Sequence, residues 1–224
     1  LPMDFHAFMK TYFASMGNAF KDMMDPQKMI DYINQATVVT VTTNDGRTNE
    51  DIFMEHFNLL IEEDIDVYLP RWEAFYDEDF FNCKKHTWQN EDIQNAVHLL
   101  KEKGYTLAIA TNPLLPIKSN LHRIRWAGLD PEDFVYISNF EHNKHCKPSL
   151  AFFEEVLSDI KANPKDCYMV GNDTTEDLIA GSLGIETYLI TDCLLNRHNA
   201  EYHTDHEGSY KDFLRFVKEL PIVK

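Results

Sequence analysis

The spacing of hydrophobic residues changes near residue 90. Before this point, apolar residues recur every three or four positions, and the clearest stripe is Phe5, Phe8, Met9, Tyr12 and Met16. This spacing is typical of amphipathic helices. After this point, short apolar runs alternate with helical segments. The change predicts a mainly helical module over residues 1–85 and an α/β domain over residues 86–224.

Two more helices are expected within the helical module. Asp25 and Pro26 open one of them, because a carboxylate suits an N-cap and proline suits the first helical turn. Thr48 or Asn49 opens the next. The β-branched run over residues 37–43 has strand propensity, but it continues the helical spacing of the residues before it. We therefore expect this run to be helical.

The α/β domain contains four short apolar runs bounded by turn residues. They cover residues 106–111, 134–138, 167–171 and 187–191. Such runs, separated by helices, predict a doubly wound parallel sheet whose strands are buried on both faces. The polar segment over residues 196–209 is expected to be a linker. Its histidines, His198, His203 and His206, favour a solvated loop over a metal site.

The composition excludes some classes of binding partner. Twenty-one lysines and arginines against 37 aspartates and glutamates give a net charge of −16, which argues against nucleic acid or an anionic membrane as partner. The sequence has no apolar run of membrane-spanning length, and no leader is recognised before the first helix. Four cysteines without metal-site spacing favour reduced thiols. We expect a cytoplasmic protein, and its oligomeric state stays open.

Polar residues follow each of the first three predicted strands. Thr111 and Asn112 end the first run, where a hydroxyl, an amide and free backbone N–H groups can hold a phosphate. Lys147 follows the second run and brings an ammonium group to the same edge of the sheet. Taken singly, each is also compatible with an ordinary loop or a solvated lysine. Together they converge on one crevice by topology.

An acidic cluster follows the third run. Asn172 and Asp173 come directly after Gly171, and Glu176 and Asp177 follow. Carboxylates at this place suit a hard cation such as Mg²⁺, which bridges one or two carboxylates to a phosphate. The structural alternative is that Asp173 caps a helix whose first turn carries the other two acids.

These residues, in this order, resemble the motifs of the haloacid dehalogenase-like hydrolases. The run 107–112 resembles the second motif of that family, Lys147 with Pro148 resembles the third, and the run 170–173 with Asp177 resembles the fourth. The resemblance covers about residues 92–220 and places the helical module where the family inserts a helical cap. The first motif, Asp-x-Asp-x-Thr after a strand, has no counterpart in this sequence.

The resemblance implies a role for each matched residue. Thr111 would hydrogen-bond the transferring phosphoryl group, and Asn112 would add its amide. Lys147 would neutralise the phosphoryl oxygens and the nucleophilic carboxylate. Asp173 would hold Mg²⁺, with Asp177 or Asn172 completing the shell. The implied reaction is attack by an aspartate on phosphorus, followed by hydrolysis of the aspartyl-phosphate by a water that a second aspartate activates.

The expected function is a Mg²⁺-dependent phosphatase that acts on a small phosphorylated metabolite. A phosphomutase shares the aspartyl-phosphate step and stays open. A dehalogenase is less favoured, because halide displacement needs no divalent cation and would leave Asp173 and Asp177 unexplained. A catalytically silent binding protein is the alternative from a different class, since both catalytic aspartates of the family belong to the first motif.

The family also implies a strand that is not in this sequence. In its strand order, the first strand lies between those predicted at residues 106 and 167. Leu1 to Asp4 fits the stretch that follows the first motif, and the sequence has no initiator methionine. We therefore expect on the order of 10 to 15 residues before Leu1, one strand and its turn, ending in the two aspartates. A strand donated by another chain is the alternative.

Overall fold

The structure, a computed structural model, describes residues 1–223. Its α-helices are α1 Phe5–Ala19, α2 Pro26–Thr42, α3 Asn49–Leu60, α4 Leu69–Asp77, α5 Glu91–Glu102, α6 Ile117–Trp126, α7 Leu150–Asp159 and α8 Tyr210–Glu219. Its strands are β1 Ala108–Ile109, β2 Tyr136–Ile137, β3 Tyr168–Gly171, β4 Glu186–Ile190 and β5 His206–Gly208. No helix in these residues combines the length and the apolar character that a membrane crossing requires.

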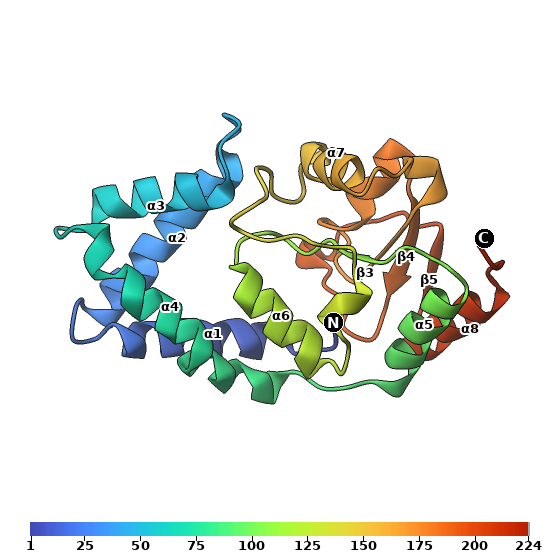
Figure 1. Ribbon diagram of the computed structural model, residues 1–224, viewed down its shortest axis with the longest axis horizontal. Coiled ribbons are helices and arrows are strands. Elements are labelled where there is room, and N and C mark those ends of the chain that lie inside the picture. Colours follow the sequence, from blue (N-terminus) through green and yellow to red (C-terminus); the bar gives the residue numbers. More distant parts are fainter. Residues whose placement is uncertain (224) are drawn as a thin grey trace.

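Helices α1 to α4 pack together beside the α/β part of the molecule (Figure 1). Asp25 caps α2 through the backbone N–H groups of Gln27 and Lys28, and Thr48 caps α3. Helix α2 continues through the β-branched run to Thr42, because Ala36 and Thr40 stay on its buried face. The three helices expected at the start of the chain are therefore confirmed.

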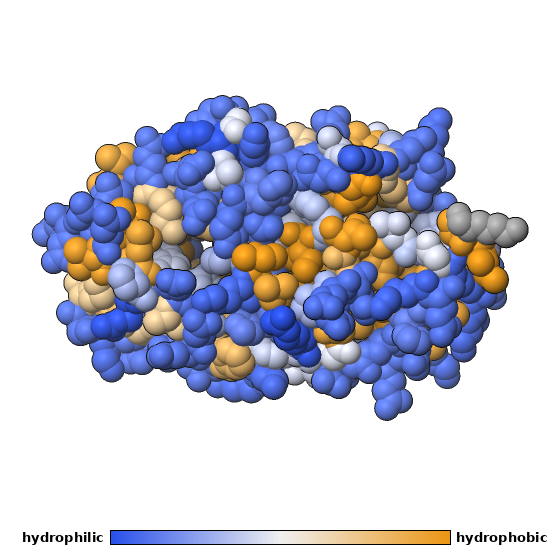
Figure 2. Space-filling model, in the orientation of Figure 1, coloured by the Kyte–Doolittle hydropathy of each residue, from blue (hydrophilic) through white to orange (hydrophobic). Residues whose placement is uncertain are grey.

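The strands form two parallel sheets in the described part of the chain. One contains β1 and β2, and the other has the order β3-β4-β5. A cavity of about 900 Å³ lies between β1 and β3, each of which pairs with a neighbour on one side only. Figure 2 shows apolar residues gathered in the middle of this face, with hydrophilic residues around them. The expected parallel α/β fold is confirmed, with its strands divided between two separate sheets.

The cavity explains why two strands are less buried than expected. The β1 residues are only partly buried, and along β3 Tyr168 and Val170 are 38% and 36% exposed. Both strands line the cavity, so their apolar side chains meet open space where a sheet interior was expected. Strand β4 lies between two neighbours, and its residues after Glu186 are buried as expected.

The prediction of a linker over residues 196–209 is wrong in part. It contains β5, which pairs in parallel with β4 at the edge of the sheet. Asp205 fastens this segment by accepting hydrogen bonds of 2.8 Å from the backbone N–H and the hydroxyl of Thr187. An edge strand tolerates polar residues, which hides it from an apolar pattern. His206 pairs with Glu186, whereas the side chain of His198 lies outside the described residues.

The start of α3 holds the helical module over the loops that follow β1 and β2. Asn49 is completely buried there, and its Nδ2 donates to the carbonyl of Pro113 at 3.2 Å. The backbone N–H of Asn49 donates to Asn143, and that of Glu50 donates to Phe140. The module therefore covers the carboxyl ends of the first two strands. The boundary between residues 85 and 86 stays a prediction.

Candidate functional site

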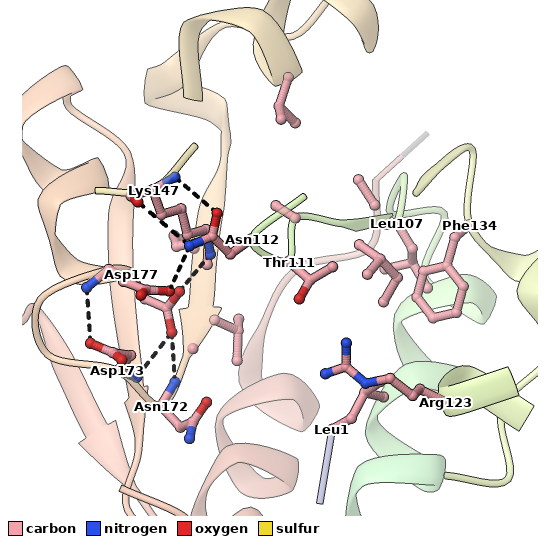
Figure 3. A pocket seen from close by; sticks show the side chains of 18 of the residues that line it. Leu1, Leu107, Thr111, Asn112, Arg123, Phe134, Lys147, Asn172, Asp173 and Asp177 are labelled. Carbon is pink, nitrogen blue, oxygen red and sulfur yellow. Dashed lines mark hydrogen bonds and ion pairs between the residues drawn. The ribbon is translucent and has the colours of Figure 1, made fainter. Parts of the chain in front are cut away.

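The cavity between β1 and β3 brings together the residues that the sequence singled out. They are Thr111, Asn112, Lys147, Asn172, Asp173 and Asp177. They come from the carboxyl ends of β1 and β3 and from the loop before α7 (Figure 3). Their expected convergence is thus observed.

Lys147 and Asp177 form a buried ion pair. The Lys147 Nζ donates to Asp177 Oδ1 at 2.6 Å, and the two side chains are 3% and 9% exposed. The rings of Phe152 and Phe153 lie with their centroids 5.6 and 5.4 Å from Nζ, which adds cation–π attraction. The ammonium group is consequently fixed in position, with its charge balanced by one carboxylate.

Asp177 also fixes the turn after β3. Its Oδ2 accepts from the backbone N–H groups of Asn172 and Asp173 at 2.9 and 3.0 Å. Gly171 makes this possible, because a Cβ at that position would overlap the Asp177 carboxylate. Both carboxylate oxygens are therefore engaged, and in this arrangement Asp177 positions Lys147. Its expected place as a metal ligand stays a prediction.

Asn172 turns its amide away from the acidic groups. Its Nδ2 donates to the backbone carbonyl of Cys193, in the loop after β4. This contact ties the turn after β3 to that loop. The role of Asn172 as a metal ligand also stays a prediction.

Asp173 has one carboxylate oxygen left over. Its Oδ1 accepts hydrogen bonds of 2.9 Å from the Thr175 and Glu176 N–H groups, so Asp173 caps a turn, whereas the helix expected there begins only at Leu178 with Asp177 at its N-cap. Its Oδ2 is buried and takes part in no hydrogen bond among the described residues, although Arg197 Nη2 lies 2.9 Å away as an ion-pair partner. A buried carboxylate oxygen that no hydrogen bond engages fits a hard cation such as Mg²⁺, which keeps most of its waters. Within residues 1–223, no group of three His, Cys, Asp or Glu side chains converges on one point.

Asn112 and Thr111 differ in how their side chains are used. Asn112 Oδ1 accepts from the Lys147 backbone N–H at 3.2 Å, and its Nδ2 lies 3.3 Å from Glu176 Oε2. It therefore cross-links the loops that carry Lys147 and Glu176. In the described structure the Thr111 hydroxyl makes no hydrogen bond, and it lies at the cavity (Figure 3). Thr111 is thus the group with a free donor for a ligand.

Arg123 is a cavity residue that the sequence did not single out. It lies on α6, its guanidinium points into the cavity (Figure 3), and Phe8 lies 5.8 Å away. Its contact with a polar side chain is Nη1 to Asn120 Oδ1 at 3.2 Å, while Nε is buried without a partner. Burial lowers the pKa of Arg123 to about 10. An arginine within a helical pattern gives no signal of such a position.

Arg197 is the second residue that the sequence analysis missed. It follows β4, in the polar segment taken for a linker, and its guanidinium lies between two acids of the site. Its Nη2 is 2.9 Å from Asp173 Oδ2, and its Nη1 is 2.9 Å from Glu176 Oε1. The topology offered one signal, since Arg197 follows the carboxyl end of a strand.

Solved structures share this fold. The HAD phosphatase from Thermococcus onnurineus has a TM-score of 0.58 and 16% identity, over 97% of this chain and 93% of that one. The 2-haloacid dehalogenase from Pseudomonas syringae pv. Tomato DC3000 has a TM-score of 0.57 and 15% identity, over 95% of this chain and 90% of that one. The L-2-haloacid dehalogenase from Xanthobacter autotrophicus with chloropropionic acid covalently bound has a TM-score of 0.53 and 12% identity, over 93% of this chain and 86% of that one. Such low identities establish the fold alone.

Sequence comparison identifies the family. No curated protein matches the chain. The family model for haloacid dehalogenase-like hydrolases matches residues 17–190, which is most of the chain and includes the six site residues singled out from the sequence, whereas Arg197 lies beyond it. On this match and on the shared fold, the chain belongs to the haloacid dehalogenase-like hydrolases.

Proposed function

We propose that this protein hydrolyses the phosphomonoester of a small metabolite. The observation that carries the proposal is that one cavity holds both a fixed ammonium group and a carboxylate oxygen that no hydrogen bond engages. Lys147 offers positive charge for phosphoryl oxygens, and Asp173 Oδ2 offers a place for a divalent cation. Positive charge fixed before the reaction stabilises the charge that develops on a transferring phosphoryl group.

The residues of this chain would bind and orient the phosphoryl group. The Thr111 hydroxyl is free to donate a hydrogen bond to it, and Lys147 would neutralise its oxygens. Asn112 and Asp177 would act as positioning residues, because both hold Lys147 in place. The helical module would restrict the entry of water over the ends of the strands.

Mg²⁺ would be held by Asp173 and would supply Lewis-acid neutralisation of the phosphoryl oxygens. This assignment favours phosphate over halide chemistry, because displacement of halide requires no divalent cation. The fold neighbours include both kinds of enzyme, so the support for phosphate chemistry comes from this local argument.

The nucleophilic aspartate is proposed to lie on a strand that fills the cavity between β1 and β3. The edges of β1 and β3 face the cavity, and Leu1 lies beside it (Figure 3). A strand of about five residues there would pair with both edges. Its carboxyl end would reach the same rim as Thr111 and Asp173, which is where the attacking carboxylate is needed.

A parallel substrate screen tests the proposal. Full-length protein is incubated with phosphorylated metabolites and, separately, with 2-haloacids, and free phosphate and free halide are measured. Phosphate release that EDTA abolishes and Mg²⁺ restores is the expected result. Halide release without phosphate release would contradict it. A Thr111→Val variant, nearly equal in shape, should lose roughly ten- to hundredfold in phosphate release, because it lacks one hydrogen bond to the reacting group.

A further inference from the structure

Arg197 occupies the one free oxygen of Asp173. Asp173 Oδ1 is used by two backbone N–H groups, so Oδ2 alone is left for another ligand. The Arg197 Nη2 stands 2.9 Å from this Oδ2 without hydrogen-bond alignment. The guanidinium therefore lies where a cation bound to Asp173 would also lie. Two positive charges in so small a space repel each other.

The second contact of Arg197 provides it with an anchor. Its Nη1 donates to Glu176 Oε1 at 2.9 Å, and this bond does not involve Asp173. The side chain is 42% exposed, so it has room to move away from Asp173. The backbone of its loop is fastened separately, because the Thr174 N–H donates to the Leu195 carbonyl at 3.0 Å and the Leu195 N–H donates to the Asn172 carbonyl at 2.8 Å. The side chain can thus leave Asp173 while the loop stays in place.

The contact of Arg197 with Asp173 affects the charge balance at the rim of the cavity. Asp173, Glu176 and Asp177 all lie at this rim without converging on one point, and Lys147 is committed to Asp177. Arg197 is therefore the cation that balances Asp173 and Glu176 in this arrangement. A divalent cation at Asp173 takes over part of that balance.

We propose that Arg197 is a built-in competitor of the divalent cation. It neutralises Asp173 while no cation is bound, and it gives up Asp173 and keeps Glu176 when one binds. Arg197 thereby weakens cation binding and sets the Mg²⁺ concentration at which the site fills. This inference rests on the cation site of the proposed function and adds its regulation.

Calorimetric titration of Mg²⁺ into the full chain tests this directly. Arg197→Gln should bind Mg²⁺ roughly threefold to tenfold more tightly than the unaltered protein, because one competing charge is gone. Arg197→Lys should lie between them, since an ammonium group cannot span two carboxylates as a guanidinium does. Arg215→Gln is the matched control, because Arg215 forms an exposed pair with Asp212 on α8, and it should change nothing.

The outcomes separate the inference from the function on which it rests. If the unaltered protein binds Mg²⁺ and Arg197→Gln binds it equally or more weakly, the proposal that Arg197 competes with the cation is overturned. No Mg²⁺ binding by any of the four proteins would overturn the cation site itself. Circular dichroism establishes that each variant is folded before titration. A tightening in Arg215→Gln equal to that in Arg197→Gln would reduce the effect to net charge and would also overturn the proposal.

Discussion

Lys147 donates to Asp177 across 2.6 Å in a place where both side chains are more than nine-tenths buried. Two buried charges lose their hydration, so the pair itself adds little to stability. Removing one partner is different, because the other is left charged, buried and unpaired. The same pair also fixes the turn after β3, since Asp177 holds the backbone of Asn172 and Asp173.

Replacing Asp177 by asparagine should destabilise the protein by about 3–5 kcal/mol, because Lys147 then lacks its counter-ion. Urea unfolding followed by circular dichroism measures this loss. The double variant Lys147→Met, Asp177→Asn should recover most of it, since it leaves no unpaired ammonium group and the asparagine carbonyl oxygen can still accept from the Asn172 and Asp173 N–H groups. A loss below about 1 kcal/mol in Asp177→Asn would mean that the pair is far more hydrated than its burial indicates.

Gly171→Ala should disrupt the same arrangement from the backbone side. The added Cβ would overlap the Asp177 carboxylate, so the carboxylate must move away from Lys147. We expect a loss of about 2 kcal/mol or more in unfolding free energy. Gly181→Ala is the matched control, because its Cβ would meet Thr187 at 3.6 Å, an ordinary contact. The two variants should differ clearly in urea midpoint, and similar midpoints would argue against the close approach at Gly171.

Asp173→Asn separates the capping role of this residue from its proposed role toward the cation. Asparagine caps a helical turn about as well as aspartate, so the fold and the urea midpoint should hardly change. Mg²⁺-dependent phosphate release should be abolished, because the side chain proposed to hold Mg²⁺ loses its negative charge. Phosphate release is measured with and without EDTA. Near-full activity that still responds to EDTA would show that another group holds the cation.

Much of this fold is predictable from local chemistry. Asp25 and Thr48 open helices because their side chains cap backbone N–H groups within three residues, which is a purely local interaction. The convergence of Thr111, Lys147 and Asp173 is also predictable, because parallel strands end at one edge of a sheet. In both cases, short-range geometry or topology decides the result.

The features that were missed depend on contacts between distant segments. Strand β5 is polar, and only its pairing with β4 and the Asp205 bonds to Thr187 reveal it. Arg197 meets Asp173 across 24 positions of sequence, and the spacing of charged residues gives no hint of that contact. Arg123 is similar, because a helical pattern cannot tell whether an arginine points to solvent or into a cavity. Tertiary packing alone determines these three.

Two cysteines should make the stability sensitive to alkaline pH. Burial raises the pKa of Cys83 and of Cys146 to about 12, above the usual value of 9. The folded state therefore holds these protons more tightly, so stability is complete below about pH 9 and falls as the pH rises toward 12. Urea unfolding at pH 8 and pH 10 measures the fall. The variant with Cys83→Ala and Cys146→Ala should show a smaller fall, and an equal fall would assign the effect to other groups.

The edges of β1 and β3 carry the last prediction. Each strand pairs on one side only, and the other side faces the cavity of about 900 Å³. Backbone groups that are buried without partners cost about 1–3 kcal/mol each, so two such edges favour a strand between them. We expect such a strand to bring the nucleophilic aspartate with it.

Hydrogen exchange on two forms of the protein decides this prediction. In the 224-residue chain alone, the amides of Ala108 and Val170 should exchange rapidly, and the cavity should bind an apolar dye. In a form of the protein that contains a strand in the cavity, both edges should be paired, so exchange at these amides should slow by orders of magnitude and dye binding should disappear. The amides of β4, paired on both sides already, should exchange slowly in both forms. Slow exchange at Ala108 and Val170 in a monomeric 224-residue chain would show that the edges need no added strand, and the aspartate would then have to come from elsewhere.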